Sequence, residues 1–432
     1  MDAVQIRRLG PMLDRFLAHF SDCFSRQPTR EHLAAYVRGL LSDLPRKSAE
    51  PIALDQGVPV RTLQEFLGAH RWDHGRLRDQ LQQLVARDHA SDHSVGMLDD
   101  SGCPKKGDKT PGVKRQYCGA TGKVDNCIIT VHLGYAAGDF HCLLDSELYL
   151  PRAWDADRPR CRAAGIPAGL VYRPKWQIAL ELYDRAVANG ARFAWLTFDE
   201  GYGGKPGLLR GLRRRRQRYV AEVPRTFSGW LQLPALTSAG RWAGEPARAV
   251  EELLASDPGL VGQPWVAYRV KEGHKGPMIW EAKHAVLFPR REDGDPGWPL
   301  HLVAARYALD RSQVKYFVSN APPGAPVETL LLVAFSRWRI ERCFEDGKTE
   351  LGFDHFEGRS YVGLLRHQRL VALAHLFCAR VCRRWGEKQP GADGVPGAGG
   401  AERVGAVVGA KAVGAGGAAG EGGGEYPAGA AA

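Results

Sequence analysis

Two apolar runs of this sequence end in carboxylates that could bind a metal ion. The run 95–98 is followed by Asp99 and Asp100, and the run 193–198 is followed by Asp199. Each run has the length and composition of a short buried strand, and sites on α/β sheets are assembled where strands end. Because Mg²⁺ prefers oxygen ligands, these side chains predict a magnesium site.

A third carboxylate, Glu341, lies in a segment with helical spacing. Arg337 precedes it by four residues and Lys348 follows it by seven, which places the three side chains on one face of a helix. Three carboxylates from separate elements can hold two Mg²⁺ ions, for which Mn²⁺ can substitute. Two such ions can activate a water molecule or a 3′-hydroxyl and stabilise the leaving oxygen in a displacement at phosphorus. Arg337 and Lys348 could bind phosphate oxygens near the cut.

Each of these patterns also has an ordinary structural interpretation. An acidic residue at the end of a strand is commonly a turn residue or a helix cap, and a helix face of mixed charge is commonly a solvated surface. The run Arg213–Arg216 with Arg218 suits contact with a DNA backbone, and a solvated helix face explains it nearly as well. We assign Arg213, Arg214 and Arg215 as candidate DNA contacts.

The elements that must position the three acids lie mainly in residues 94–224. The predicted order of elements is that of a ribonuclease-H-like sheet: three strands in succession, then a helix, a strand, a helix and a strand. The expected strands are 95–99, 114–119, 126–135, 192–198 and 219–223, and the expected helices are 176–188 and 208–218.

The segments on either side of this core have a different character. Residues 1–90 have helical periodicity, and the helix patterns 48–55 and 60–67, separated by Gly57, are typical of a helix-turn-helix. This unit could contact DNA, or it could be a plain helical bundle packed on the core. Residues 225–330 predict a β-rich insertion, with strand patterns at 265–270, 279–288, 300–307 and 315–319.

The last quarter of the chain returns to helix and then changes composition. Residues 326–350 read as helix with Gly352 as a stop, so 331–386 would complete the core and carry Glu341. Residues 387–432 are mainly Gly, Ala and Val with a single aromatic side chain, and we expect them to be disordered. We therefore expect an N-terminal helical domain 1–90, a split α/β core 91–224 and 331–386, an insertion 225–330 and a tail.

Charge and cysteine usage limit the class of protein. The chain has 432 residues and a formal charge of +11, which suits a polyanionic partner, although many Arg-rich proteins are basic for other reasons. Its nine cysteines form no CxxC pair and no zinc-like spacing, as expected for a reduced cytosol. No apolar run reaches 18 residues, so we expect no membrane partner and a cytoplasmic, nucleoid-associated protein.

Three blocks of this sequence together resemble the bacterial insertion-sequence transposases of the DDE type. They are Asp99-Asp100-Ser101-Gly102-Cys103-Pro104-Lys105-Lys106-Gly107 with Arg115-Gln116-Tyr117-Cys118-Gly119, then Asp199-Glu200-Gly201-Tyr202-Gly203, and finally Arg337-Trp338-x-Ile340-Glu341 with Lys348-x-x-Leu351-Gly352 and the segment up to Ser360.

The resemblance implies a ribonuclease-H-like fold with a β insertion before the Glu, and Mg²⁺-dependent DNA cleavage at element ends followed by joining to a target. It implies Asp100, Asp199 and Glu341 as catalytic metal ligands, with Asp99 as the alternative to Asp100. We add Lys105 and Lys106 to the candidate DNA contacts and expect a homodimer on double-stranded DNA. A nuclease on the same fold, or an impaired remnant that only binds DNA, are the alternatives.

The sequence departs from the family at three places. Ala334 stands where related sequences have a tyrosine, a single histidine, His367, stands where they have several, and the Gly/Ala tail replaces a helical C-terminus. A decayed copy is therefore one interpretation, although all three acids are present.

Overall fold

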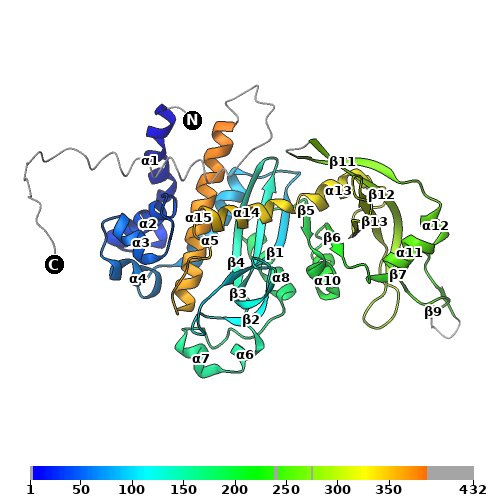
Figure 1. Ribbon diagram of the computed structural model, residues 1–432, viewed down its shortest axis with the longest axis horizontal. Coiled ribbons are helices and arrows are strands. Elements are labelled where there is room, and N and C mark those ends of the chain that lie inside the picture. The colour runs from blue at the N-terminus through cyan, green and yellow to red at the C-terminus, as the bar shows by residue number, and fades with distance from the viewer. Residues whose placement is uncertain (1–2, 238–241, 274–275, 387–432) are drawn as a thin grey trace, which may run out of the picture.

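A computed structural model describes residues 3–237, 242–273 and 276–386 of the chain. The predicted disorder of residues 387–432 lies outside these residues. In Figure 1 the N-terminal helices lie on one side of a central core and the insertion lies on the other. No helix within the described ranges is both long and apolar enough to cross a membrane.

The core is a sheet with the strand order of a ribonuclease-H-like fold, as expected. Strand β1 pairs with β3 antiparallel and with β5 parallel, β5 pairs with β6 parallel, and β4 pairs with β3 antiparallel. The order is thus β4-β3-β1-β5-β6. The core strands are β1 Val95–Pro104, β3 Lys123–Ala137, β4 Phe140–Leu148, β5 Trp195–Phe198 and β6 Tyr219–Val223, and a further strand, β2 Lys114–Cys118, pairs with β3.

The third strand of the core differs from the prediction. We expected 114–119 to be a core strand, but β2 pairs only with the first residues of β3 and forms a hairpin with it. The third core strand is β4, which the sequence reading missed. It contains the buried acids Asp145 and Glu147, and buried charges interrupt the pattern that marks a strand.

Helices cover the two faces of this sheet differently. On one face α13 packs over β5 and β6, and α14 packs over β1, β3 and β4. On the other face α8 packs over β3 and β4 and against α10. These helices are α6 Arg152–Asp155, α7 Arg158–Ala163, α8 Lys175–Ala188, α9 Glu200–Gly203, α10 Pro206–Arg214, α13 Val327–Phe335 and α14 Trp338–Thr349.

The predicted β-rich insertion extends the core sheet. Strand β14 pairs antiparallel with β6, so the insertion strands continue the hydrogen-bond ladder of the core into one sheet of 12 strands. Its elements are β7 Ser228–Trp230, β8 Ala235–Leu236, β9 Trp242–Ala243, β10 Arg248–Ala249, α11 Val250–Ser256, α12 Pro258–Val261, β11 Val266–Gly273, β12 Gly276–Pro289, β13 Leu300–Tyr307 and β14 Val314–Ser319.

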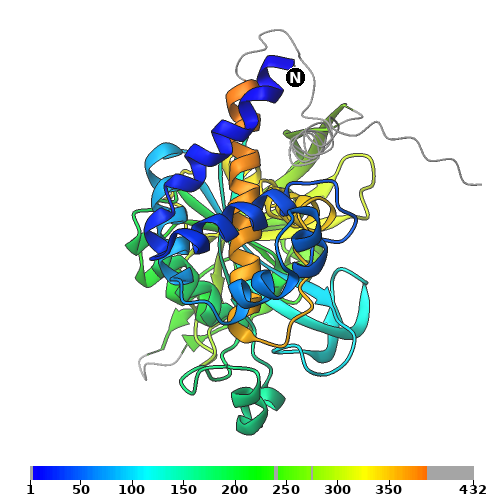
Figure 2. The same cartoon turned by 90° about the vertical axis from the view of Figure 1, so that its left-hand side faces the viewer.

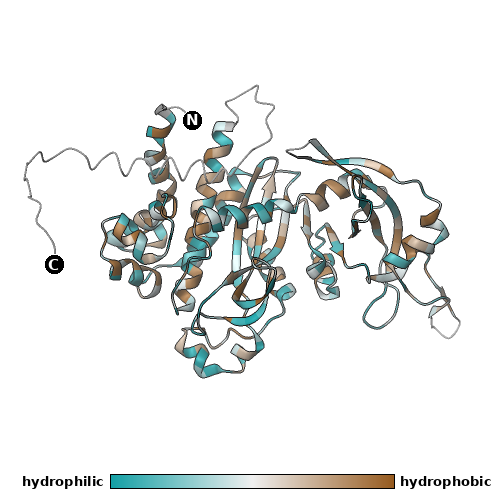
Figure 3. Cartoon of the chain, viewed as in Figure 1, coloured by the Kyte–Doolittle hydropathy of each residue, from teal (hydrophilic) through white to brown (hydrophobic). Residues whose placement is uncertain are grey.

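The N-terminal helices are held to the core by a long C-terminal helix that we did not predict. Helix α15 runs behind them in Figure 2, and hydrophobic residues are frequent along it and in α13 in Figure 3. Arg366 of α15 donates to the backbone carbonyls of Phe66, Leu67 and Trp72, and Tyr36 contacts His367. These helices are α1 Ala3–Ala18, α2 Gln27–Leu40, α3 Ala49–Asp55, α4 Val60–Gly68, α5 His74–Asp88 and α15 Tyr361–Gly386, with a 3₁₀ turn at Ser21–Cys23.

Two local predictions are confirmed by the backbone. Helices α3 and α4 flank Gly57, whose φ of 65° is the left-handed conformation that a glycine turn requires. Gly352, with the same φ of 65°, follows the end of α14. The role of α3 and α4 as a helix-turn-helix stays a prediction.

Candidate active site

Strand alternation places Asp99 and Asp100 on opposite faces of the sheet. Met97 belongs to the apolar cluster that contains Ile340 of α14, and Leu98 belongs to the cluster that contains Ile178 of α8. Because successive side chains of a strand point to opposite faces, Asp99 continues the α14 face and Asp100 continues the α8 face.

On the α14 face a single guanidinium joins Asp99 to Glu341. Arg337 Nη1 donates to Asp99 Oδ2 at 2.9 Å, and Arg337 Nη2 lies 2.7 Å from Glu341 Oε1. The Asp99 side chain is 14% exposed, whereas that of Glu341 is 55% exposed. The helix spacing predicted from Arg337 to Glu341 therefore does bring the two side chains together, and it also brings them to Asp99.

The surroundings of Asp99 disfavour its charge. Burial, followed by the nearby carboxylate of Asp199, raises the pKa of Asp99 to about 7, although Arg337 opposes the shift. A cation brought to this group would relieve both effects, because it replaces lost hydration and separates like charges. The side chain therefore has the electrostatic character of a cation ligand.

On the α8 face Asp100 is held by a lysine and a tyrosine. Lys175 Nζ, from the first residue of α8, donates to both carboxylate oxygens of Asp100 at 2.9 Å each. The hydroxyl of Tyr202 donates to Asp100 Oδ2 at 3.3 Å. Sequence reasoning gave no role to Lys175 and began this helix one residue later.

Asp199 follows β5, the neighbour of β1, and also caps a helix. Its Oδ1 accepts a hydrogen bond from the backbone nitrogen of Tyr202 at 3.2 Å, so it is the N-cap of α9. Burial raises the pKa of Asp199, and nearby Asp100 adds to that rise, while Arg337 and the cap bond lower it. Asp199 thus has the helix-capping role that we gave as the structural interpretation of an acid at a strand end, and it also lies near other carboxylates.

Within the described ranges, no three His, Cys, Asp or Glu side chains are arranged so that they could hold one metal ion. The geometry above explains why. Asp99 and Asp100 point to opposite faces, and the cations Lys175 and Arg337 occupy the carboxylates that a metal ion would use. The hard oxygen donors fit Mg²⁺ in their chemistry, but they need to reorient to converge on it.

The other predicted basic residues separate into engaged and exposed groups. Lys105 Nζ donates to the carbonyls of Asp354 and Phe356, both at 2.7 Å, so this ammonium fixes the loop after α14. Lys106 is exposed. Lys348 lies at the site, where its Nζ donates to the carbonyl of Gly102 at 3.2 Å.

The arginines of α10 also differ from one another. Arg215 forms a two-point ion pair with Asp184 of α8, which neutralises it. Arg213 lies over the exposed ring of Trp298 at 4.5 Å, and Arg214 is exposed. The structure therefore leaves two of the three predicted arginines available to a ligand.

The insertion reaches the helix of Glu341, a contact that the sequence did not reveal. Lys271 of β11 places its Nζ 3.6 Å from the centre of the Trp338 ring. Lys271 also interacts electrostatically with Glu341, so this candidate acid is flanked by a cation from the insertion.

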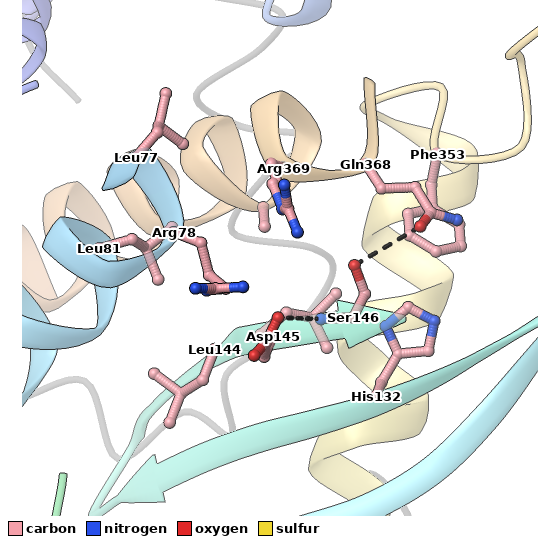
Figure 4. Close-up of a pocket in the computed structure, with 12 residues that line it drawn as sticks. Leu77, Arg78, Leu81, His132, Leu144, Asp145, Ser146, Phe353, Gln368 and Arg369 are labelled. Atoms are coloured by element: carbon pink, nitrogen blue, oxygen red, sulfur yellow. Dashed lines mark hydrogen bonds between the residues drawn. The ribbon is translucent and has the colours of Figure 1, made fainter. Parts of the chain in front are cut away.

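A small enclosed cavity lies away from these acids, between α5, β4 and α15 (Figure 4). Its volume of about 10 Å³ is room for about one water molecule. Arg369 and Gln368 line the cavity. Among the described residues, Nε and Nη1 of Arg369 and Nε2 of Gln368 have no hydrogen-bond partner. The cavity lies at the interface between the N-terminal helices and the sheet.

Two comparisons relate this chain to known proteins. A family described as DDE superfamily endonuclease matches residues 19–281. The chain is also similar to a probable transposase for insertion sequence element IS701 from Microchaete diplosiphon, with 33% identity over 205 residues. That similarity covers 46% of this chain and 51% of the relative, so the chain spans about half the length of the relative.

Proposed function

Since the chain belongs to the DDE superfamily endonucleases, we propose that it is an insertion-sequence transposase that cuts DNA at element ends and joins them to a target. The observation that carries the proposal is the proximity of Asp99 and Asp100, which lie within β1 and not at its end as expected, to Asp199, which follows β5, with Glu341 joined to Asp99 through Arg337. The family match ends before Glu341, so the third acid is supported by this contact and by the sequence block around it.

DDE endonucleases use divalent metal ions, and we propose Mg²⁺, as two ions, with Mn²⁺ as a substitute. Asp100, Asp199 and Glu341 are the proposed ligands, with Asp99 as the alternative to Asp100. When bound, the ions would supply activation of the attacking water or hydroxyl and stabilisation of the leaving oxygen.

The basic side chains of the site have distinct proposed tasks toward DNA. Arg337 positions Glu341 and Asp99, and its planar guanidinium suits a phosphate when it is released from one of them. Lys348 is next to the strand that carries Asp100 and can bind a phosphate oxygen as a point charge. Lys106, Arg213 and Arg214 are exposed and are proposed backbone contacts, with a homodimer as the proposed form on DNA.

A cleavage and strand-transfer assay with the terminal repeats that flank the gene tests the proposal. The wild-type chain should cut those ends in Mg²⁺ and join them to a target duplex, and Asp199→Asn should do neither. Cutting without joining would indicate a nuclease on the same fold, and DNA binding without cutting would indicate an impaired remnant.

The choice between the two neighbouring aspartates has its own test. Asp100→Asn should abolish cleavage and lower the affinity for Mn²⁺, whereas Asp99→Asn should retain part of both. The reverse order would assign the first ligand to Asp99, on the face that carries Glu341.

A further inference from the structure

The small cavity between α5, β4 and α15 is lined by buried hydrogen-bond donors that lack acceptors (Figure 4). Arg369 of α15 is only 6% exposed, and within the described ranges its Nε and Nη1 have no hydrogen-bond partner. Gln368 is 1% exposed and has a partner for its Oε1, the Ser146 hydroxyl at 3.5 Å, but none for its Nε2. Guanidinium and amide nitrogens donate hydrogen bonds and accept none, so the cavity needs an acceptor.

The acids closest to Arg369 in charge are held by a different cation. Asp145 Oδ2 accepts a hydrogen bond from Arg185 Nε at 2.7 Å. Glu147 Oε2 lies 3.8 Å from Arg185 Nη2, and its Oε1 accepts from the Tyr361 hydroxyl at 2.9 Å. A buried charge that keeps neither water nor hydrogen-bonded partners strongly disfavours the folded state, so Arg369 calls for a counter-ion.

The side of the cavity formed by α5 and α15 is electrically positive. Arg78 of α5 lines the cavity together with Arg369, and its ion pair is with its neighbour Asp79 at 2.7 Å. Burial, followed by repulsion from Arg369 and Arg366, lowers the pKa of His74 to about 4. These cations therefore favour a negative charge in the cavity over a neutral molecule.

We propose that the cavity binds one chloride ion, which joins the N-terminal helices to the core. A volume of about 10 Å³ admits a single monatomic ion or water molecule and excludes polyatomic anions such as acetate. A chloride ion accepts from the nitrogens of Arg369 and Gln368 together and neutralises the guanidinium, whereas a water molecule leaves the charge uncompensated. His132 also lines the cavity, and its Nδ1 donates to the ion when its Nε2 accepts from the Thr130 hydroxyl 2.7 Å away.

Thermal unfolding of the full chain at different chloride concentrations tests the site. The ionic strength is kept constant with sodium acetate, whose anion is too large to enter the cavity. The melting temperature should rise with chloride, and bromide should have the same effect. Above the dissociation constant, each tenfold rise in chloride should raise the melting temperature by about 2 °C, given an unfolding entropy of about 2.1 cal/mol/K per residue.

Two variants of α15 separate this site from general effects of salt. Arg369→Met replaces the guanidinium by an apolar side chain, so its melting temperature should not depend on chloride. At low chloride it should melt at or above the temperature of the wild type, because a buried charge without a counter-ion has been removed. The matched control is Arg384→Met, which removes an exposed arginine of the same helix and should keep the full chloride dependence.

Anomalous X-ray scattering from crystals of the wild-type chain grown in bromide locates the ion directly. A bromide peak should lie within hydrogen-bond reach of Arg369 Nε and Gln368 Nε2, and this measurement decides the matter if Arg369→Met does not fold. The lack of such a peak would overturn the proposal and assign the cavity to water. A chloride effect that persists in Arg369→Met would also overturn it, as screening of surface charges. Neither measurement involves DNA, so the ion site and the proposed function can fail independently.

Discussion

Replacing Gly203 with alanine should displace the helix that fixes Asp199. Gly203 is the last residue of α9, and a Cβ built there would lie 1.9 Å from the backbone carbonyl oxygen of Glu222 and 2.9 Å from its carbon. Contacts of Cβ atoms below 3.0 Å are essentially never seen, so α9 or β6 has to withdraw by more than about 1 Å. The obstacle is backbone of a central strand, which cannot rotate away.

The expected magnitude follows from that displacement. Overpacking of this kind costs about 1–3 kcal/mol, which lowers the melting temperature by roughly 2–12 °C for a domain of about 200 residues. Asp199 caps α9, so it moves with the helix, and a misplacement of about 1 Å in an active site costs about a hundredfold in rate. We therefore expect a moderate loss of stability and a much larger loss of cleavage and of Mn²⁺ affinity.

Thermal unfolding and Mn²⁺ titration measure the two effects separately. The matched control is Gly68→Ala, the same change at the end of α4, where a Cβ meets nothing within 4 Å. It should change stability by less than about 1 kcal/mol and leave Mn²⁺ affinity unaltered. If Gly203→Ala keeps both the melting temperature and the Mn²⁺ affinity of the wild type, the packing of α9 on β6 does not position Asp199.

Three further predictions concern other residues of the structure. Glu341→Gln should abolish cleavage and leave DNA affinity nearly unchanged in a filter-binding assay, and normal cutting would remove Glu341 from the site. Lys348→Ala should lower the slope of log DNA affinity against log salt by about one, with little change in melting temperature. Arg337→Ala should lower the same slope and, because Asp99 loses its ion-pair partner, should also lower the free energy of unfolding by about 3 kcal/mol. Burial lowers the pKa of His375 to about 3 and that of His367 to about 4, below 6.5 in the unfolded chain. Because the unfolded chain binds protons at these histidines at a higher pH than the folded chain does, their contribution to stability is complete above about pH 6.5 and is lost as the pH falls toward 4. The melting temperature should therefore drop over that pH range, and His375→Leu should reduce the drop.

The sequence predicted the elements that have a local signature and missed those that depend on distant partners. Strands β6 and β13 and helix α8 were placed within a residue of their ends, because apolar residues predominate in each of them. Strand β4 was missed because it buries Asp145 and Glu147, and the cation that compensates them is Arg185 of α8. A local pattern cannot show that a buried charge is paired 40 residues away.

Helix α15 was missed for the same reason. Its first third buries the polar run Arg366, His367, Gln368 and Arg369, which breaks the apolar stripe of an amphipathic helix. The Nη1 and Nη2 nitrogens of Arg366 donate to backbone carbonyls of Phe66, Leu67 and Trp72, so this residue joins two parts of the chain. The candidate acids were found from motifs, but strand alternation alone could not tell which of Asp99 and Asp100 faces α14, since that depends on which helix covers which face.

The pairing of Lys175 with Asp100 has a consequence for metal binding. A metal ion that uses Asp100 must displace the ammonium, so the free chain contains an internal competitor for its own cofactor. Two charges at about 4 Å near a protein surface interact with about 4 kcal/mol, and the Lys175 side chain is 34% exposed, which screens much of this. We expect a net competition of about 1.4 kcal/mol, so Lys175→Gln should bind Mn²⁺ roughly tenfold more tightly in the absence of DNA.

Electron paramagnetic resonance of free Mn²⁺ measures that affinity without any cleavage. Lys175→Arg keeps the charge and should bind Mn²⁺ like the wild type, and Lys109→Gln, which removes an exposed lysine, should do the same. An unchanged or weakened affinity in Lys175→Gln would show that the lysine only supports the fold. If Asp100→Asn leaves Mn²⁺ affinity intact, the error lies in the choice of Asp100 itself, and the same reasoning then transfers to Asp99 and its own counter-cation, Arg337.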